Sequence, residues 1–295
     1  MSSMFPFNAA RILCPVDRSE LSSLALKYAV VGARVFKARL TILEAIHFDY
    51  PRYLSEELTT RVLKETERYK VSAENDLAGH VRSIAGDALD GIPMSCHVLD
   101  LPPAQAISRI IEEEDSNLVV MGTHGYSGFK HWMLGSVTES MLHLSSVPVF
   151  TVRQKTDDFI DPREPEAGPE IRNIICSCDM GPASGRALQV AASLARRFEA
   201  ELTAVWSCDS NGSGGEEQLQ QWIEDTLQGY YPVTGVVRQG AAATQVIDLA
   251  GEIQSDLIVI GIRHRSFGEA MVMGRTTELV LRHAPVPVLA VPLFE

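Results

Sequence analysis

One segment of the sequence gathers residue types that could hold a phosphate group. After a short apolar run it has Gly122 and Gly125, then nine residues, then Gly135 and Ser136. A glycine directly after a buried strand permits a tight turn and lets ligand atoms approach the backbone closely. Ser136 and Glu139 have the Ser-x-x-Glu spacing of a capping box, which predicts that a helix begins at Ser136. The segment therefore combines a glycine-rich loop with a helix N-terminus.

Such a helix N-terminus is suited to bind an anion. The amides of the first turn have no partner within the helix, and the helix macrodipole favours negative charge there. Ser136 and Thr138 add hydroxyl donors. In a parallel sheet the ligand crevice lies at the carboxyl ends of the strands, where Asp17 follows the first apolar run and Ala45 stands near the end of the second. We expect these groups to converge on one phosphate-binding crevice.

An internal repeat provides the elements that must position these residues. The apolar runs that end at Asp17 and Asp179 match at an offset of 162 residues. Later in each copy the offset falls to 139, which places a deletion of 23 residues in the middle of the second copy. These later matches pair residues 117–122 with 256–261 and residues 147–152 with 286–291.

Each copy alternates apolar strands with amphipathic helices, a pattern typical of a mainly parallel sheet covered on both faces. In the first copy, strands are expected at residues 12–16, 40–46, 94–98, 118–121 and 147–152. Helices are expected at residues 21–36, 54–77, 103–113 and 137–144. We predict an α/β protein of two tandem doubly wound domains with five-stranded, mainly parallel sheets. The domains would cover residues 1–155 and 171–295, with an acidic linker at residues 156–170.

Composition narrows the classes of partner. The chain has 295 residues and a formal net charge of -12, so a nucleic-acid binder that neutralises phosphates is not expected. No secretory signal and no apolar stretch of about 18 residues stands in the sequence, so no membrane span is expected. The five cysteines form no Cys-x-x-Cys pair, and we interpret them as reduced. We expect a cytoplasmic protein.

With the motif and the repeat in view, the sequence resembles the universal stress protein family. The resemblance rests on Gly-x2-Gly-x9-Gly-Ser after an apolar strand, with an aspartate after the first strand, and covers nearly the whole chain as a tandem pair. It implies a Rossmann-like fold of the adenine nucleotide alpha hydrolase-like group. It also implies that the first copy binds ATP, with AMP or ADP as alternatives and magnesium as a companion ion.

The resemblance further assigns contacts to individual residues. It implies that Asp17 and the backbone of Ala45 contact the adenine or its ribose. Gly122 and Gly125 would line the ribose and phosphates. The full set of expected nucleotide contacts is Pro15, Asp17, Ala45, Met121, Gly122, Gly125, Gly135, Ser136, Val137 and Thr138.

The family likeness also implies a mode of assembly. The last strands of the two copies, at Val147-Pro-Val and Val286-Pro-Val, would meet across a pseudo-twofold axis within the chain. Pro148 and Pro287 suit edge strands, because proline cannot donate to a ladder on both sides. A homodimer of the whole chain is a further expectation.

The second copy departs from the nucleotide pattern. His264 replaces the second glycine, and Arg275 replaces the serine that follows Gly274. A histidine adds bulk and does not readily take a positive φ. We therefore expect a degenerate site in the second copy, although Arg275 could also pair with a phosphate.

Two other functions stay open at this point. No Gly-x4-Gly-Lys-Ser/Thr loop and no Gly-x-Ser-x-Gly elbow is present, and no catalytic residue is assigned. A slow ATP-hydrolysing or adenylating enzyme is one alternative, and a scaffold without nucleotide is the other. His124, His131 and His143 lack a cysteine or carboxylate at ligand spacing, so no metal site is expected.

Overall fold

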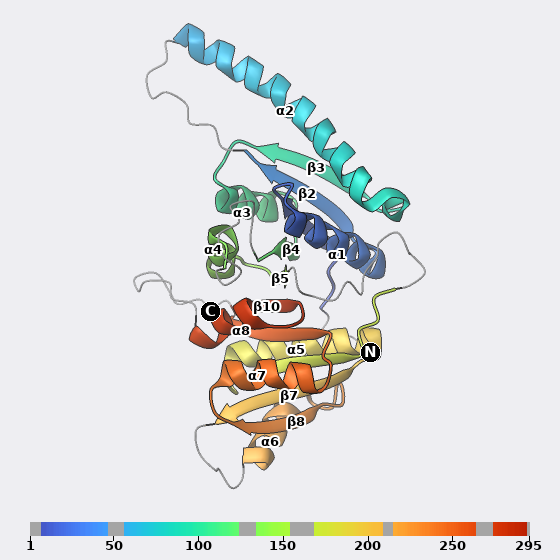
Figure 1. Cartoon of the computed structure of the whole chain (residues 1–295), viewed down its shortest axis with the longest axis vertical. Coiled ribbons are helices and arrows are strands. Elements are labelled where there is room, and N and C mark those ends of the chain that lie inside the picture. The colour runs from blue at the N-terminus through green and yellow to red at the C-terminus, as the bar shows by residue number, and fades with distance from the viewer. Residues whose placement is uncertain are drawn as a thin grey trace.

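The computed structural model describes residues 7–46, 56–123, 134–153, 168–208, 215–263 and 274–293, and in residues 56–69 it describes the backbone alone. Within these ranges strands and helices alternate through both halves of the chain. Figure 1 shows the two halves stacked end to end, the first above the second.

In its described residues the first half contains five strands, four α-helices and a short 3₁₀ turn. Its strands are β1 (Arg11–Val16), β2 (Arg39–Ala45), β3 (Met94–Leu99), β4 (Leu118–Gly122) and β5 (Val149–Val152). Its helices are α1 (Glu20–Phe36), α2 (Glu56–Ala85), η1 (Gly86–Leu89), α3 (Pro103–Glu113) and α4 (Ser136–Leu144).

The second half repeats this order. Its strands are β6 (Asn173–Cys178), β7 (Glu201–Cys208), β8 (Thr234–Gln239), β9 (Leu257–Arg263) and β10 (Val288–Leu293). Its helices are α5 (Pro182–Phe198), α6 (Gly215–Leu227), α7 (Ala242–Glu252) and α8 (Arg275–His283).

The strands form one continuous sheet in the order β3-β2-β1-β4-β5-β10-β9-β6-β7-β8. Within each half all pairs are parallel, which matches the predicted fold class. The antiparallel pair β5 and β10 joins the halves, with Phe150 opposite Leu289.

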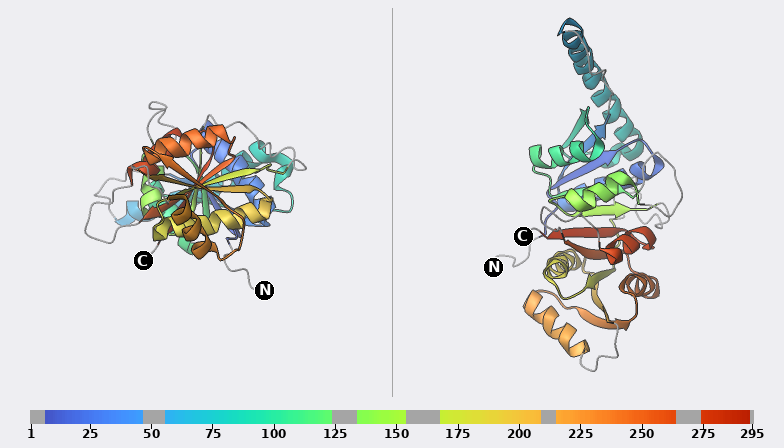
Figure 2. Two further views of the ribbon diagram at one scale, coloured as in Figure 1. Left: turned by 90° about the horizontal axis from the view of Figure 1, so that it is seen from below. Right: turned by 90° about the vertical axis from the view of Figure 1, so that its left-hand side faces the viewer.

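Helices cover both faces of the sheet, as Figure 2 shows in its end-on view. One buried cluster packs α1, α2, α5 and α6 on one face, and a second packs α3, α4, α7 and α8 on the other. Each helix buries one stripe of apolar side chains against strands that are apolar on both sides, as in other doubly wound sheets. Both clusters run through the two halves without a break.

Two element boundaries differ from the predicted ones. Helix α2 continues to Ala85, eight residues beyond the expected end, because Val81 and Ala85 carry its buried stripe onward over the sheet. Strand β5 begins after Pro148, since a proline has no amide to donate to a neighbouring strand. The amino-terminal part of α2 runs out past the rest of the first half (Figure 1). In the described parts of the chain, no helix is both long and apolar enough to span a bilayer.

Candidate functional site

The strand order places a topological switch point between β1 and β4, where ligands bind in open α/β sheets. The ladder between these strands is short: it pairs Ile12 with Leu118 and Leu13 with Val119. The matching ladder between β6 and β9 continues for two further pairs, to Ser177 opposite Ile260. Toward the carboxyl ends, the two central strands of the first half therefore have fewer paired residues than those of the second half.

Pro15 accounts for this early separation. The Arg39 amide donates to the Ala10 carbonyl at 2.9 Å, so alternation along β1 turns the odd-numbered residues toward β4. Pro15 faces β4 without an amide hydrogen, and the ladder cannot continue through it. Ser177, at the matching position in β6, keeps its amide. Pro15 was expected to belong to the site, and its missing amide hydrogen is a physical reason why a proline there would matter.

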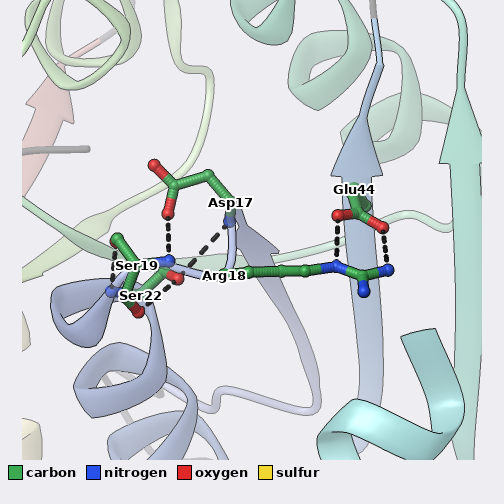
Figure 3. Close-up of polar contacts among 5 residues, drawn as sticks. All are labelled: Asp17, Arg18, Ser19, Ser22 and Glu44. Carbon is green, nitrogen blue, oxygen red and sulfur yellow. Dashed lines mark hydrogen bonds and ion pairs between the residues drawn. The ribbon is translucent and has the colours of Figure 1, made fainter. Parts of the chain in front are cut away.

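The turn after β1 is tied by its own side chains, as Figure 3 shows. Asp17 Oδ1 accepts from the Ser19 amide at 3.0 Å, and Ser19 Oγ in turn accepts from the Ser22 amide at 3.1 Å as the N-cap of α1. Asp17 itself is solvent exposed at the carboxyl end of β1. The Ser19 amide thus holds the carboxylate in place at this exposed turn.

The turn after β1 also contains an ion pair, between Arg18 and Glu44, that the sequence analysis did not predict. Arg18 has a left-handed backbone, with φ of 61°, and its guanidinium forks onto Glu44 at 2.8 and 3.0 Å (Figure 3). The pair ties the end of β1 to the end of β2, next to Ala45. Its signal was present in the sequence as opposite charges at the ends of two adjacent strands. The second copy has Met180 and Trp206 at these positions.

Helix α4 begins at Ser136, but the predicted capping box does not form. Gly135 is the N-cap, with φ of -65° and ψ of 144°, and its carbonyl accepts from the Glu139 amide at 2.9 Å. Ser136 is already helical, so its side chain stands one position too late to cap. Among the described residues, no side chain caps this end, and Ser136 is solvent exposed. The amides of residues 136–138 lie in the first turn of α4, where amides have no partner within the helix.

Thr138 was expected to offer a hydroxyl to a ligand, and that expectation is wrong. Its side chain is buried, and Oγ1 donates to the Gly122 carbonyl at 2.8 Å. The bond instead locks the start of α4 onto the end of β4. The Gly135 amide donates to the Thr123 carbonyl at 2.8 Å and strengthens the same junction.

Gly122, which was predicted to let a ligand approach, has a packing role in the structure. A Cβ at this position would stand 2.7 Å from Leu21 Cγ of α1, so the space that a side chain would need is already occupied by Leu21. Its φ lies outside the left-handed region, so no tight turn requires a glycine there. Gly261 is the equivalent in β9, where a Cβ would stand 2.4 Å from the Ala183 carbonyl oxygen. The glycine after this strand is therefore explained by helix packing in both halves.

The remaining predicted residues differ in how they could reach a ligand. Ala45 and Val137 are half-buried at the carboxyl end of the sheet, but the Met121 side chain is buried in the core beneath α4. Met121 could present only its backbone to a ligand. Gly125 lies outside the described residues, as does residue 264 of the second copy.

The second copy uses its equivalent groups differently. Asp179 Oδ1 accepts from the Gly181 amide at 2.9 Å and from the Ser184 hydroxyl at 2.7 Å. The matching hydroxyl of the first copy, on Ser22, donates to the Ser19 carbonyl at 3.0 Å. The Ser184 hydroxyl lies at the same distance from the Gly181 carbonyl, so its contact with the aspartate is what distinguishes the second copy. Arg275 is the first residue of α8 and is exposed. The matching helix N-terminus thus carries a long cationic side chain in place of a short hydroxyl.

Other chemistry finds little support in the described ranges. They contain no cluster of three His, Cys, Asp or Glu side chains that could hold a metal ion. All five cysteines are free thiols. Burial raises the pKa of the Cys14 thiol far above its ordinary value, because the charged thiolate would lose its hydration in the core.

Comparison with known proteins places these features in a family context. The sequence model of the universal stress protein family matches residues 9–153 and 170–292. Universal stress protein Rv2623 of Mycobacterium tuberculosis is 26% identical over 302 residues, which cover 94% of this chain and 95% of that protein. Universal stress protein MJ0577 of Methanocaldococcus jannaschii is 29% identical and aligns to 49% of this chain and 95% of its own length.

A solved structure shares the fold over the whole length. The crystal structure of a universal stress protein from Archaeoglobus fulgidus superposes with a TM-score of 0.72 and covers 97% of this chain and 99% of its own. The two sequences are 23% identical, so this likeness concerns the fold alone.

Proposed function

This chain belongs to the universal stress protein family, and from that premise we propose that its first domain, residues 1–155, binds ATP as a regulatory ligand in the cytoplasm. The observation that carries the proposal is the exposed N-terminus of α4 at the switch-point crevice, which Pro15 keeps from closing. Backbone amides of residues 136–138 and the Ser136 hydroxyl would hold the phosphates.

The adenosine end of the nucleotide would lie against the ends of β1 and β2. Asp17 is exposed there, and its carboxylate suits the hydroxyl groups of a ribose. The Arg18 and Glu44 pair joins the two strand ends, and Asp17 and Ala45 at these ends would contact the adenosine together. Magnesium would arrive with the triphosphate, because Mg²⁺ usually binds through substrate phosphates and a few waters.

The second domain, residues 171–295, would leave its crevice without nucleotide. Asp179 is engaged by two donors of its own turn, and the β6–β9 ladder extends further toward the carboxyl ends. Its helix N-terminus carries Arg275 in place of serine. We propose that this half serves as a structural partner, so that one chain takes the form of a dimer joined through β5 and β10.

The short turn between α4 and β5 could link nucleotide binding to the β5–β10 ladder. Helix α4 leads directly into β5, and the turn between them is fixed by the Ser145 hydroxyl, which donates to the Val147 carbonyl at 2.7 Å. Phosphate contact at the start of α4 would therefore stiffen the element next to the interdomain ladder. Partner proteins would sense this change on the surface of the two-domain unit.

Calorimetric titration of the nucleotide-free full chain with ATP and magnesium tests the proposal. We expect one site per chain, weakened at least about tenfold, or ~1.4 kcal/mol, in Ser136→Arg, which imports the residue of the second copy. Arg275→Ser is the matched control and should leave affinity and stoichiometry unchanged. Unaltered binding in Ser136→Arg, or binding abolished by Arg275→Ser, contradicts the assignment. Release of ADP, AMP or pyrophosphate at ordinary enzyme rates would instead favour an enzyme.

A further inference from the structure

On the face of the sheet covered by α1 and α5, the seam between the two halves contains a cavity of about 80 Å³. It lies toward the amino ends of the strands, where Ile12 and Leu118 form part of its floor, and so away from the nucleotide crevice at the carboxyl ends. These floor residues are buried, whereas the helix residues Val31 and Phe36 at the rim are half-buried. The cavity therefore opens outward between the two helices.

Aromatic rings make up much of the wall. Phe36 stands edge-on to Phe7 at a centroid distance of 6.3 Å and to Phe198 at 6.4 Å, and Tyr28 contacts Phe150 at 5.6 Å. The surface that lines the cavity is almost entirely apolar. Because both halves contribute rings, a molecule bound here would touch both domains at once.

One difference between the two first helices leaves room in this cavity. Gly32 of α1 corresponds to Leu194 of α5, and both residues line the space. A Cβ on Gly32 would make only an ordinary contact with Ile12 Cδ1, at 3.4 Å, so packing does not require a glycine. A glycine inside a helix also costs stability relative to alanine. The space is thus left open where the other half has a leucine.

The charged groups near the cavity are engaged elsewhere. Asp256 lines it, but Oδ2 of this residue accepts from the amides of Arg172 at 2.7 Å and Asn173 at 2.9 Å. Arg197 of α5 stacks over the Phe36 ring at 4.7 Å and donates to the Val35 carbonyl, which fixes the rim across the two helices. No charge in the described wall is thereby presented to an occupant.

We propose that this seam cavity is a second binding site, which takes a small uncharged hydrocarbon group, either an aromatic ring or a compact alkyl group. Its volume is several times the roughly 10–15 Å³ that one water needs, but a water there would find few hydrogen-bond partners. An apolar group gains contact with the rings, whereas a carboxylate would lose its hydration without compensation. The site joins α1 to α5 and is independent of the proposed nucleotide site.

Methyl-detected NMR titration of the full chain tests this site, with benzene as the aromatic probe, cyclohexane as the alkyl probe and benzoate as the charged analogue. We expect saturable shifts centred on the methyl groups of Ile12, Leu118 and Leu257. Benzoate should bind at least about tenfold more weakly than benzene. The relative affinity for benzene and cyclohexane distinguishes an aromatic from an alkyl ligand.

Gly32→Leu fills the space with the residue of the second half and should abolish saturable binding of both neutral probes. Gly32→Ala is the milder variant and should weaken binding by about threefold or more, since its methyl group occupies part of the space. Gly79→Leu, on an exposed position of α2 with open space around it, is the matched control and should bind as the wild type does. Absence of saturable shifts in the wild type, or retained binding in both Gly32 variants, overturns the proposal.

Discussion

The two halves of this chain have the same strand order and equally long first helices, but they differ at the carboxyl ends of their sheets. In the first half, Pro15 stops the β1–β4 ladder early and Ser136 begins the last helix. In the second, Ser177 continues the ladder and Arg275 begins the helix. The fold thus places a helix N-terminus at the carboxyl end of the sheet in both halves, and we propose that these side chains decide whether a ligand can bind there.

What the halves share is equally informative. Gly122 and Gly261 both stand where a strand passes under the first helix of its half, and both lack room for a Cβ. The glycine persists in the second half although His264 and Arg275 replace the second glycine and the serine of the nucleotide pattern. A glycine at this position therefore reports helix packing in each half and does not by itself indicate a ligand.

The largest expected effect concerns these two glycines. In Gly261→Ala the new methyl group would meet backbone atoms of Ala183 and Ser184, which cannot move aside, so we expect a loss of about 3 kcal/mol in the free energy of unfolding. In Gly122→Ala it would meet the Leu21 side chain, which can shift, so a loss of about 1 kcal/mol is expected. Urea unfolding of both variants measures the difference. Equal losses would show that the packing argument fails.

Substitution of Asp17 and of Asp179, the aspartates that follow β1 and β6, should affect different properties: ATP affinity in the first case and stability in the second. Asp179→Ala removes the acceptor of two hydrogen bonds and should cost about 1–2 kcal/mol of unfolding free energy without changing ATP affinity. Asp17→Ala should cost less stability but weaken ATP binding about tenfold. Calorimetry and urea unfolding on the same preparations compare them. An ATP affinity that falls in Asp179→Ala but not in Asp17→Ala reverses the assignment of the two halves.

Pro15→Ser tests whether ladder length controls the crevice. The serine restores an amide facing β4, so the ladder should extend as it does through Ser177 and stability should rise by about 0.5–1.5 kcal/mol. ATP affinity should fall about fivefold as the crevice narrows, close to ~1 kcal/mol. Amide exchange at position 15 and calorimetry report the two effects. If affinity stays constant while the new amide becomes protected, ladder length does not matter for binding.

The smallest expected effect belongs to the Arg18 and Glu44 pair. Arg18→Met imports the residue found at position 180 and removes a fork that is 43% exposed on the arginine side. Such a partly exposed pair contributes about 0.5 kcal/mol. Thermal unfolding at low and high salt should show a small difference that shrinks as salt rises. A loss several times larger would mean that the left-handed turn depends on this fork.

Much of the fold could be predicted from the sequence because its signals are local and repeated. Alternating apolar runs and helical stripes appear twice with the same spacing, and α3 and α4 lie close to their predicted residues. The end of α2 was missed, because its charged composition hides the widely spaced residues Val81 and Ala85 that keep it on the sheet.

The candidate site was harder to predict, because its details depend on contacts across the sheet. Composition cannot show that Leu21 fills the space above Gly122, or that the Thr138 hydroxyl turns to a carbonyl of β4. The capping-box pattern matched in spacing, yet Gly135 is the N-cap, because its carbonyl accepts the first helical hydrogen bond and Ser136 already lies inside the helix. Sequence spacing located the start of α4, while the contacts of each side chain around it depended on packing.

The most direct measurement of the central claim is a crystal structure of the full chain grown with ATP and magnesium. The account predicts one nucleotide per chain, with its phosphates at the amides of residues 136–138 and its adenosine beside Asp17 and Ala45. A nucleotide seated only against β6 and β9, or a first crevice filled by the protein's own side chains, would contradict it.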